Sequence, residues 1–260
     1  MLKTLSKKVM LQVAALCTVT TLMLPVVGAE ASITAYTPSQ ALQNYKKYMA
    51  SYTKQDVPVV ESFRSQYDGS LGDKVVARAI WYMKYGSMVY NHKKYPVTGQ
   101  IDCSNFTQLV YGDFGYKITS ASRNYTGVGT RISGIYAKND PGKNRYAIVG
   151  LSKMKPGDIV AFWDSTRDHI GHVAIYMGVI DGHPRVIGTS DGHPTAIGID
   201  DLENSWMGGR IHSVRRLLPS DAWTPSAGAK YNAKAPTIPT KYFLQPQTKV
   251  IMPSNLQYGF

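Results

Sequence analysis

Residues 101–115, IDCSNFTQLVYGDFG, constrain the fold of this chain more than any other segment, because they predict a helix that begins at a cysteine. Apolar residues follow the cysteine at helical spacing and form one stripe: Phe106, Leu109, Val110 and Phe114. Asp102 is a residue type that caps helix N-termini, and Gly115 suits a helix end. We therefore predict that Cys103 opens an amphipathic helix, with its thiol at the positive end of the helix dipole.

This placement makes Cys103 a candidate nucleophile, because a helix N-terminus favours the thiolate, the species that attacks carbonyl carbons. A buried structural cysteine is the alternative, since free cysteine is among the most buried residue types. The chain has two cysteines, and Cys17 falls in a segment that we expect to be removed. An exported protein would then keep one thiol without a disulfide partner, which favours a reactive role.

The first 31 residues have the pattern of a secretory signal peptide. Three lysines precede an apolar run over residues 9–27, and small residues follow around Ala29. A transmembrane anchor is the alternative, but the run contains three threonines and Pro25. We expect secretion to the extracellular space or the cell wall, with no stable membrane anchor after cleavage.

The chain is basic, with a formal net charge of +12. Its Lys and Arg residues are scattered, which is typical of a generally basic surface rather than a nucleic-acid site. Outside a cell, such a charge attracts polyanions. Anionic wall polymers are therefore expected partners, and nucleic acid is not.

The order of predicted elements indicates an α+β fold, with helices first and an antiparallel sheet after them. We expect helices over residues 38–51 and 74–86, with a polar connector between them, and a long loop-rich segment over residues 117–151. Five strand candidates then follow at hairpin spacing: residues 159–163, 172–177, 185–189, 196–199 and 211–217. The cysteine helix should pack on this sheet. From Pro219 onward the chain is proline-rich and lacks apolar periodicity.

A cysteine nucleophile needs a base, and histidine titrates in the right range. Six histidines are present, and two of them, His169 and His172, lie in the stretch DHIGHVAIYMG. His172 stands at the start of an apolar strand, which makes it the better base. As metal ligands the two lack further partners at recognisable spacing, so we expect no metal site.

Three motifs together resemble the NlpC/P60 family of cell-wall cysteine peptidases. They are Asp-Cys-Ser at a helix start, Lys-Pro-Gly-Asp before an apolar strand, and Gly-His-Val-Ala-Ile-Tyr-Met-Gly at the next strand. The resemblance implies a papain-like α+β fold, with N-terminal helices packed on an antiparallel sheet of about five strands. It also implies hydrolysis of peptidoglycan stem peptides, usually between D-γ-glutamyl and the following diamino acid, without a cofactor.

The resemblance covers part of the chain, so we divide the sequence into four parts. Residues 1–31 are the signal peptide, 32–73 an N-terminal helical extension, 74–217 the NlpC/P60-like catalytic domain and 218–260 a Pro-rich C-terminal tail. We expect a monomer whose partner is peptidoglycan.

Carried over by position, the family's functional residues give Cys103 as nucleophile and His172 as base. Asp102 and Ser104 would lie near the amino end of the substrate, and Tyr90 would line the site. The segment after Tyr90 departs from the family, because the double glycine that usually follows the tyrosine is missing.

The third catalytic position, a polar residue on the strand after the histidine strand, falls at Gly188 in the most direct alignment. Glycine cannot orient an imidazole. Ser190, Asp191 or His193 would accept the Nδ1 hydrogen bond after a small change of register, and a backbone carbonyl or water would serve at some loss of rate.

Three functions remain open from the sequence. The first is a secreted cysteine endopeptidase that uses Cys103 and His172. The second is an N-acetylmuramoyl-alanine-type amidase with the same two residues. The third, suggested by Gly188 and the basic surface, is a catalytically degenerate wall-binding protein.

Overall fold

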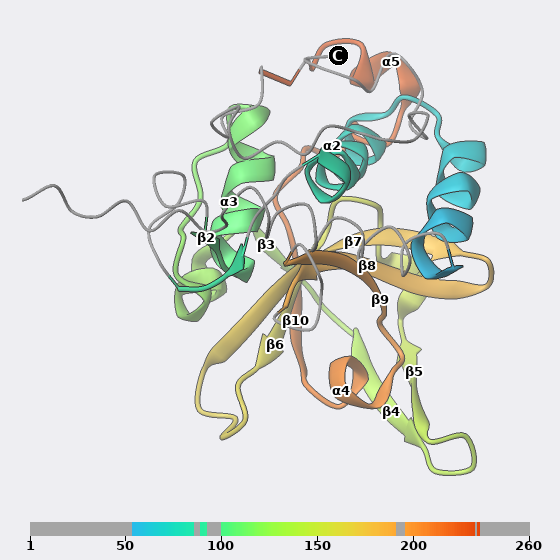
Figure 1. Ribbon diagram of the computed structural model, residues 1–260, viewed down its shortest axis with the longest axis vertical. Helices are drawn as coiled ribbons and strands as arrows, with labels where there is room; N and C mark the ends of the chain where they lie inside the picture. Colours follow the sequence, from blue (N-terminus) through green and yellow to red (C-terminus); the bar gives the residue numbers. More distant parts are fainter. Residues whose placement is uncertain (1–53, 86–88, 93–99, 191–195, 232, 235–260) are drawn as a thin grey trace, which may run out of the picture. The chain divides into compact units, whose positions relative to one another are not determined.

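A six-stranded antiparallel sheet forms the centre of the computed structural model (Figure 1). The structure describes residues 54–85, 89–92, 100–190, 196–231 and 233–234. The strand order is β3-β10-β6-β7-β8-β9. Its strands are β3 Thr130–Ile132, β6 Ile159–Trp163, β7 Ile170–Ile180, β8 His183–Thr189, β9 Ile197–Asp201 and β10 Ile211–Arg216.

Helices and two small strand pairs surround this sheet. The helices are α2 Leu71–Tyr85, α3 Cys103–Asp113, α4 Ser205–Gly208 and α5 Pro225–Gly228, with 3₁₀ turns η1 Ser122–Gly127 and η2 Leu151–Lys153. Residues 54–66 are also helical. The pairs are β1 Val89–Tyr90 with β2 Gln100–Ile101, which run parallel, and the antiparallel hairpin of β4 Tyr136–Asp140 with β5 Arg145–Val149.

The predicted α+β architecture is confirmed, and each of the five predicted strands overlaps a strand of the sheet. The sheet has one strand more than expected, because β3 pairs with β10 at its edge. The hairpin β4–β5 also falls in residues 117–151, where we expected mainly loop. Most side chains of this hairpin are exposed or half-buried, and neither face of it forms a buried apolar row. The sequence of the hairpin therefore lacks the apolar alternation that predicts a strand.

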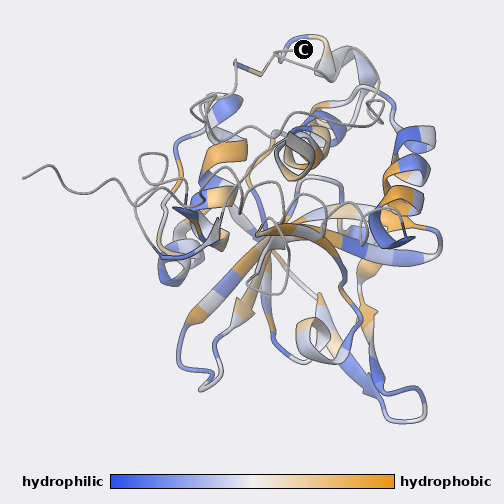
Figure 2. Cartoon of the chain, in the orientation of Figure 1, coloured by the Kyte–Doolittle hydropathy of each residue, from blue (hydrophilic) through white to orange (hydrophobic). Residues whose placement is uncertain are grey.

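The two faces of the sheet pack against different layers. Along β7, Val173 and Ile175 point into the core shared with α2 and α3, whereas Ala174 and Tyr176 point into a second core on the opposite face. The apolar faces of the helices and strands meet in these layers (Figure 2). Alternation along one strand therefore buries both sides of β7, which explains its continuous apolar sequence.

Two local predictions about the N-terminal helices are wrong. Helix α2 begins at Leu71 rather than at residue 74, and Ser70 caps it, since Ser70 Oγ accepts a hydrogen bond from the backbone N–H of Asp73 at 3.4 Å. Residues 54–66, expected as a polar connector, form a helix that buries Val59, Val60 and Phe63 in the core. The predicted helix over residues 38–51 and the signal peptide lie outside the described residues.

The first part of the expected tail packs on the domain. Lys74 Nζ donates to the carbonyl oxygens of Gly228 at 2.7 Å and Tyr231 at 3.0 Å. Arg78 donates to the carbonyl oxygen of Lys234 at 3.0 Å and forms an ion pair with Asp113 at 3.4 Å, with both side chains about 1% exposed. Within the described ranges no helix combines the length and apolarity needed to cross a membrane.

Candidate functional site

Cys103 is the first residue of α3, as the sequence predicted. Asp102 is the N-cap, and its Oδ1 accepts a hydrogen bond from the backbone N–H of Asn105 at 2.8 Å. Asp102 thus satisfies one of the donors that a helix start leaves open, and it fixes where the helix begins. The cysteine side chain is 3% exposed and belongs to the core that α3 shares with β7.

Burial, rather than the helix dipole, dominates the acidity of Cys103. Loss of solvent raises the pKa of the thiol to about 12, and the neighbouring Asp102 carboxylate also raises it. The nearby backbone N–H groups of Val173, Ser104 and Cys103 itself lower the pKa in part. The expectation that the helix start alone favours the thiolate is therefore wrong. A neighbouring base must take the proton before this sulfur can act as a nucleophile.

His172 lies on β7 beside the residue that contacts this sulfur. Its Cα pairs with Phe162 across the sheet, and its side chain is 8% exposed. The imidazole is packed between two aromatic rings, with centroid distances of 5.5 Å to Phe162 and 5.5 Å to Trp206. Val173, which directly follows His172, shares the core with Cys103, whereas the His172 ring packs against Phe162 of the second core.

A cleft of about 310 Å³ opens beside His172. It is lined by Tyr90, His172, Thr189, Ser190, Asp200, Asn204, Trp206 and Met207. Two of the predicted site residues, Tyr90 and His172, share this cleft although they are far apart in the sequence. Cys103 is not among the lining residues. Two larger cavities of about 590 and 710 Å³ contain none of the predicted site residues, so the smaller cleft is the candidate active site.

The other predicted substrate-binding residues form a polar group around the start of α3. Asp102 Oδ2 lies 3.3 Å from Nδ1 of His92, and the His92 ring meets the edge of Tyr90 at a centroid distance of 5.6 Å. Ser104 Oγ lies 2.9 Å from Asp102 Oδ1 and 2.7 Å from the carbonyl oxygen of Ser120. His92 thus connects Asp102 to Tyr90, a role that its loop position did not reveal.

The strand register decides which residue stands beside His172. Ile175 pairs with Ile187, and continuing this antiparallel pairing places Ser190 opposite His172. Gly188 instead lies against Ala174, whose Cβ would be 3.1 Å from a Cβ added at Gly188. Ser190 also lines the cleft. It is the described alternative for the third position, since Asp191 and His193 lie outside the described residues.

Sequence reasoning missed the residues that close the far side of the cleft: Asp200, Asn204 and Trp206. Asn204 caps α4 by accepting a hydrogen bond from the Met207 N–H at 2.7 Å, and this short helix presents Trp206 to His172. Asn followed by Ser and Trp is a usable helix-start signal. Nothing in the sequence indicates that the helix lies over β7.

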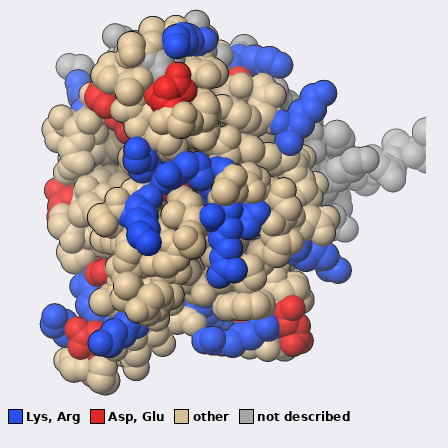
Figure 3. Space-filling view, turned by 180° about the vertical axis from the view of Figure 1, so that it is seen from behind, with Lys and Arg blue, Asp and Glu red and all other residues tan. Residues whose placement is uncertain are grey.

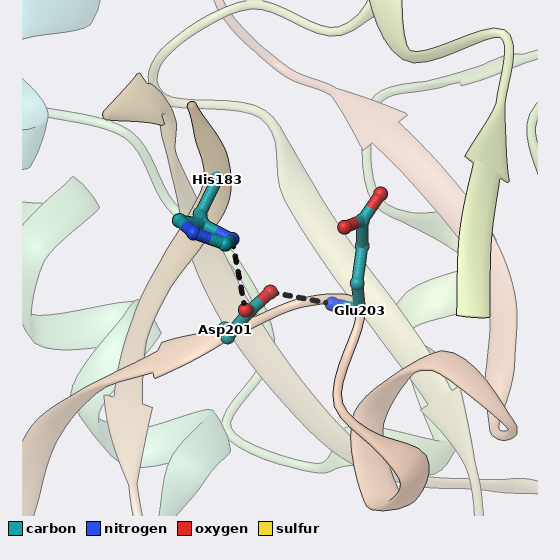
Figure 4. A group of neighbouring side chains, drawn as sticks. All are labelled: His183, Asp201 and Glu203. Carbon is teal, nitrogen blue, oxygen red and sulfur yellow. Dashed lines mark hydrogen bonds and ion pairs between the residues drawn. The ribbon is translucent and has the colours of Figure 1, made fainter. Parts of the chain in front are cut away.

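One group of possible metal ligands occurs among the described residues, and an arginine side chain already contacts all three of its members. His183, Asp201 and Glu203 have ligand atoms within 4.8 Å of one another (Figure 4). A guanidinium nitrogen of Arg145 lies 3.2 Å from Asp201 and 2.5 Å from Glu203, and 3.3 Å from Nδ1 of His183. The cluster is therefore organised as an ion-pair network around Arg145, since the cation occupies the position that a metal ion would need.

Comparison with known proteins identifies the family to which the chain belongs. The profile of the NlpC/P60 family matches residues 83–216, and the chain belongs to this family. Its members are generally cysteine peptidases that hydrolyse peptidoglycan. A search of curated proteins found no match to the chain.

Solved structures with similarity to this chain include three from different organisms. A lipoprotein-like NLP/P60 protein from Staphylococcus aureus has 20% identity and a TM-score of 0.41, covering 58% of this chain and 42% of its own. An NlpC/P60 protein from Bacillus cereus has 20% identity and a TM-score of 0.39, covering 57% and 40%. An NlpC protein from Trichomonas vaginalis has 18% identity and a TM-score of 0.40, covering 57% and 45%. The chain thus spans less than half the length of each of these three.

Proposed function

We propose that this protein is a secreted cysteine endopeptidase that hydrolyses peptidoglycan stem peptides, with Cys103 as nucleophile and His172 as base. Residues 1–31 would act as the signal peptide, and the scissile bond would join D-γ-glutamate to the diamino acid. The observation that carries the proposal is the packing of the start of α3 on β7, where Cys103 shares one core with Val173, the residue that directly follows His172.

The proposed reaction begins with transfer of the Cys103 proton to His172. The thiolate attacks the scissile carbonyl carbon, and N–H groups at the start of α3 stabilise the oxyanion. The tetrahedral intermediate expels the amine, which takes the proton from His172 as it leaves. Water, activated by the neutral imidazole, then hydrolyses the thioester and returns the free thiol.

The surroundings of His172 support this role. Phe162 and Trp206 hold the ring from two sides, which restricts its orientation. Ser190 lines the same cleft as His172, and in this proposal it accepts a hydrogen bond from the imidazole as the third residue. Tyr90 lines the cleft, while Asp102 and Ser104 fix the helix start and face the amino end of the substrate in this proposal.

Burial of Cys103 favours one competing function, that of a catalytically inert wall-binding protein. A thiol with 3% exposure and a pKa near 12 is unreactive unless a base and substrate reach it. Turnover separates the two functions, because an inert protein binds stem peptides without cleaving them.

The test is hydrolysis of one purified muropeptide of known structure, followed by mass spectrometry. The wild type should release fragments that end in D-γ-glutamate, and Cys103→Ala should release none while keeping the melting temperature of the wild type. Release of intact stem peptides from the sugar would instead identify an amidase. Full activity of Cys103→Ala would remove the proposal.

A further inference from the structure

A second concave surface lies apart from the catalytic cleft and shares no lining residue with it. This groove has a volume of about 710 Å³. It lies between β3, the end of β10 and the segment that precedes α5, and is lined by Gly129, Thr130, Arg131, Ile132, Ser133, Lys155, Arg216, Leu217, Leu218, Ser220 and Trp223. We call it the basic groove. Strand β3 is at the rear of Figure 1, and the rear view shows Lys and Arg side chains gathered across the middle of that face (Figure 3).

The lining of the basic groove carries positive charge without a carboxylate. Arg131 and Lys155 are exposed lining residues, and Lys153 stands at the rim, where its Nζ donates to the carbonyl oxygen of the lining residue Ser133 at 3.2 Å. In the described part of the chain none of these three cations forms a salt bridge. Concave surfaces with one sign of charge concentrate counter-ions of the other sign.

Arg216 has a structural role in the groove rather than a free charge. Its guanidinium donates to both carboxylate oxygens of the buried Asp158, at 2.8 and 2.7 Å, so its charge is matched within the protein. Its outer face stacks on Trp223 at 4.6 Å from the ring centroid. The pair holds the groove floor in place, and the net positive charge comes from the other three cations.

An unfavourable charge pair at the groove edge also points to an anionic ligand. Arg131 on β3 is directly opposite Arg215 on β10, and opposed like charges destabilise a sheet. Arg215 is committed to the protein, because it donates to the carbonyl oxygens of Thr126, Val128 and Gly129. A bound anion beside Arg131 would relieve this repulsion.

The aromatic content of the groove decides between kinds of polyanion. Trp223 is the one aromatic residue that lines the groove. The charged groups of Lys155 and Arg216 lie over its ring, each 4.6 Å from the ring centroid. Its Nε1 also donates to the carbonyl oxygen of Pro156 at 2.8 Å. The ring is therefore occupied and offers no platform for stacking a nucleobase, which single-stranded nucleic acids require.

A membrane surface also fits poorly. Insertion into a lipid interface needs protruding apolar side chains. Among the described residues the exposed large hydrophobic side chains are Tyr136, Val179 and Trp206, and none of them lines the basic groove. A flexible chain of phosphates without bases matches both the concave shape and the charge.

We propose that the basic groove binds a linear polyol-phosphate polymer of the cell wall and holds the enzyme on its substrate. The choice of a wall polymer rests on the proposed function, whereas the recognition of repeated phosphodiesters rests on the groove itself. Arg131, Lys153 and Lys155 contact successive phosphates, and the hydroxyls of Thr130 and Ser133 lie beside them as hydrogen-bond donors.

The test measures binding of a synthetic poly(glycerol phosphate) to the full mature chain by isothermal titration calorimetry at low and at physiological salt. The groove variant combines Arg131→Gln with Lys155→Gln. The matched control combines Lys117→Gln with Lys138→Gln, which removes the same charge from exposed positions outside the groove. Both double variants must keep the melting temperature of the wild type. If a double variant is less stable, its two single substitutions are measured instead.

Two lost phosphate contacts should weaken binding about 10- to 30-fold in the groove variant, and the control should change less than about twofold. The affinity should also depend less steeply on salt in the groove variant. Equal loss in both variants would overturn the proposal, because it would show attraction by overall charge alone. Tighter groove-dependent binding of a DNA oligonucleotide of equal charge, or of phosphatidylglycerol vesicles, would overturn it in favour of those partners.

Enzyme assays separate this proposal from the catalytic one. The groove variant should cleave a soluble muropeptide at the wild-type rate, and Cys103→Ala should bind the polymer with wild-type affinity. Polymer binding without any peptide hydrolysis by the wild type would refute the proposed function alone. Hydrolysis without groove-dependent binding would refute the groove alone.

Discussion

Asp102 has two separable effects on the cysteine helix, and a pair of substitutions distinguishes them. Its Oδ1 accepts a hydrogen bond from the Asn105 N–H at 2.8 Å and lies within 2.9 Å of both Ser104 Oγ and Asn105 Nδ2. Asp102→Ala removes the cap and leaves these donors without their acceptor. Loss of an N-cap costs about 1 kcal/mol, and the added side-chain contacts bring the expected loss to about 1–2 kcal/mol. The midpoint of urea unfolding should then fall by about 0.5–1 M.

Asp102→Asn keeps an acceptor oxygen and removes the negative charge. We expect its unfolding free energy to stay within about 0.5 kcal/mol of the wild type. Because the Asp102 carboxylate raises the pKa of Cys103, either substitution should lower that pKa and raise the rate of iodoacetamide alkylation at a fixed pH. Equal stability loss in the two variants, or slower alkylation of the Asn variant than of the wild type, would refute this reasoning.

Three further substitutions test other contacts. Arg78→Ala leaves a buried carboxylate without its ion-pair partner and should cost about 3–5 kcal/mol of unfolding free energy, so a loss below about 1 kcal/mol would contradict the buried ion pair. Trp206→Ala removes from His172 an aromatic ring that is 46% exposed. It should lower kcat/KM for a muropeptide, while the unfolding free energy should change by less than about 1 kcal/mol. An unchanged kcat/KM would contradict the role of Trp206 in holding the His172 ring. Gly150→Ala places a Cβ at a residue with φ +77°, against the carbonyl oxygen of Gly134. The unfolding free energy should fall by about 1–3 kcal/mol, and the melting temperature should fall with it. An unchanged melting temperature would show that this turn relaxes freely.

The helix and strand pattern could be predicted where burial imposes a period. Strand β6 has the predicted bounds, and α3 begins at the predicted residue with the predicted cap, because apolar spacing and capping chemistry are local properties. Strand β3 and the hairpin β4–β5 could not be predicted in the same way. Their stability comes from backbone pairing with distant or polar partners, which leaves little trace in hydropathy.

The secondary-structure positions of Cys103 and His172 could be predicted, but their surroundings could not. The sequence placed Cys103 at a helix start and His172 on an apolar strand, and the structure has both residues in these elements. The depth of Cys103 in the core and the packing of Trp206 over His172 depend on the tertiary structure. For this reason the sequence predicted an acidic thiol, whereas burial raises the pKa. The pairing of Ile175 with Ile187, continued along the two strands, puts Ser190 rather than Gly188 opposite His172.

The most direct test of the catalytic pair is the pH dependence of Cys103 alkylation in the wild type and in His172→Ala. If His172 takes the thiol proton, the wild type should react faster than the variant near neutral pH. The variant should instead gain about tenfold in rate with each pH unit as it approaches a thiol pKa near 12. Superimposable pH profiles for the two proteins would contradict the pairing of Cys103 with His172.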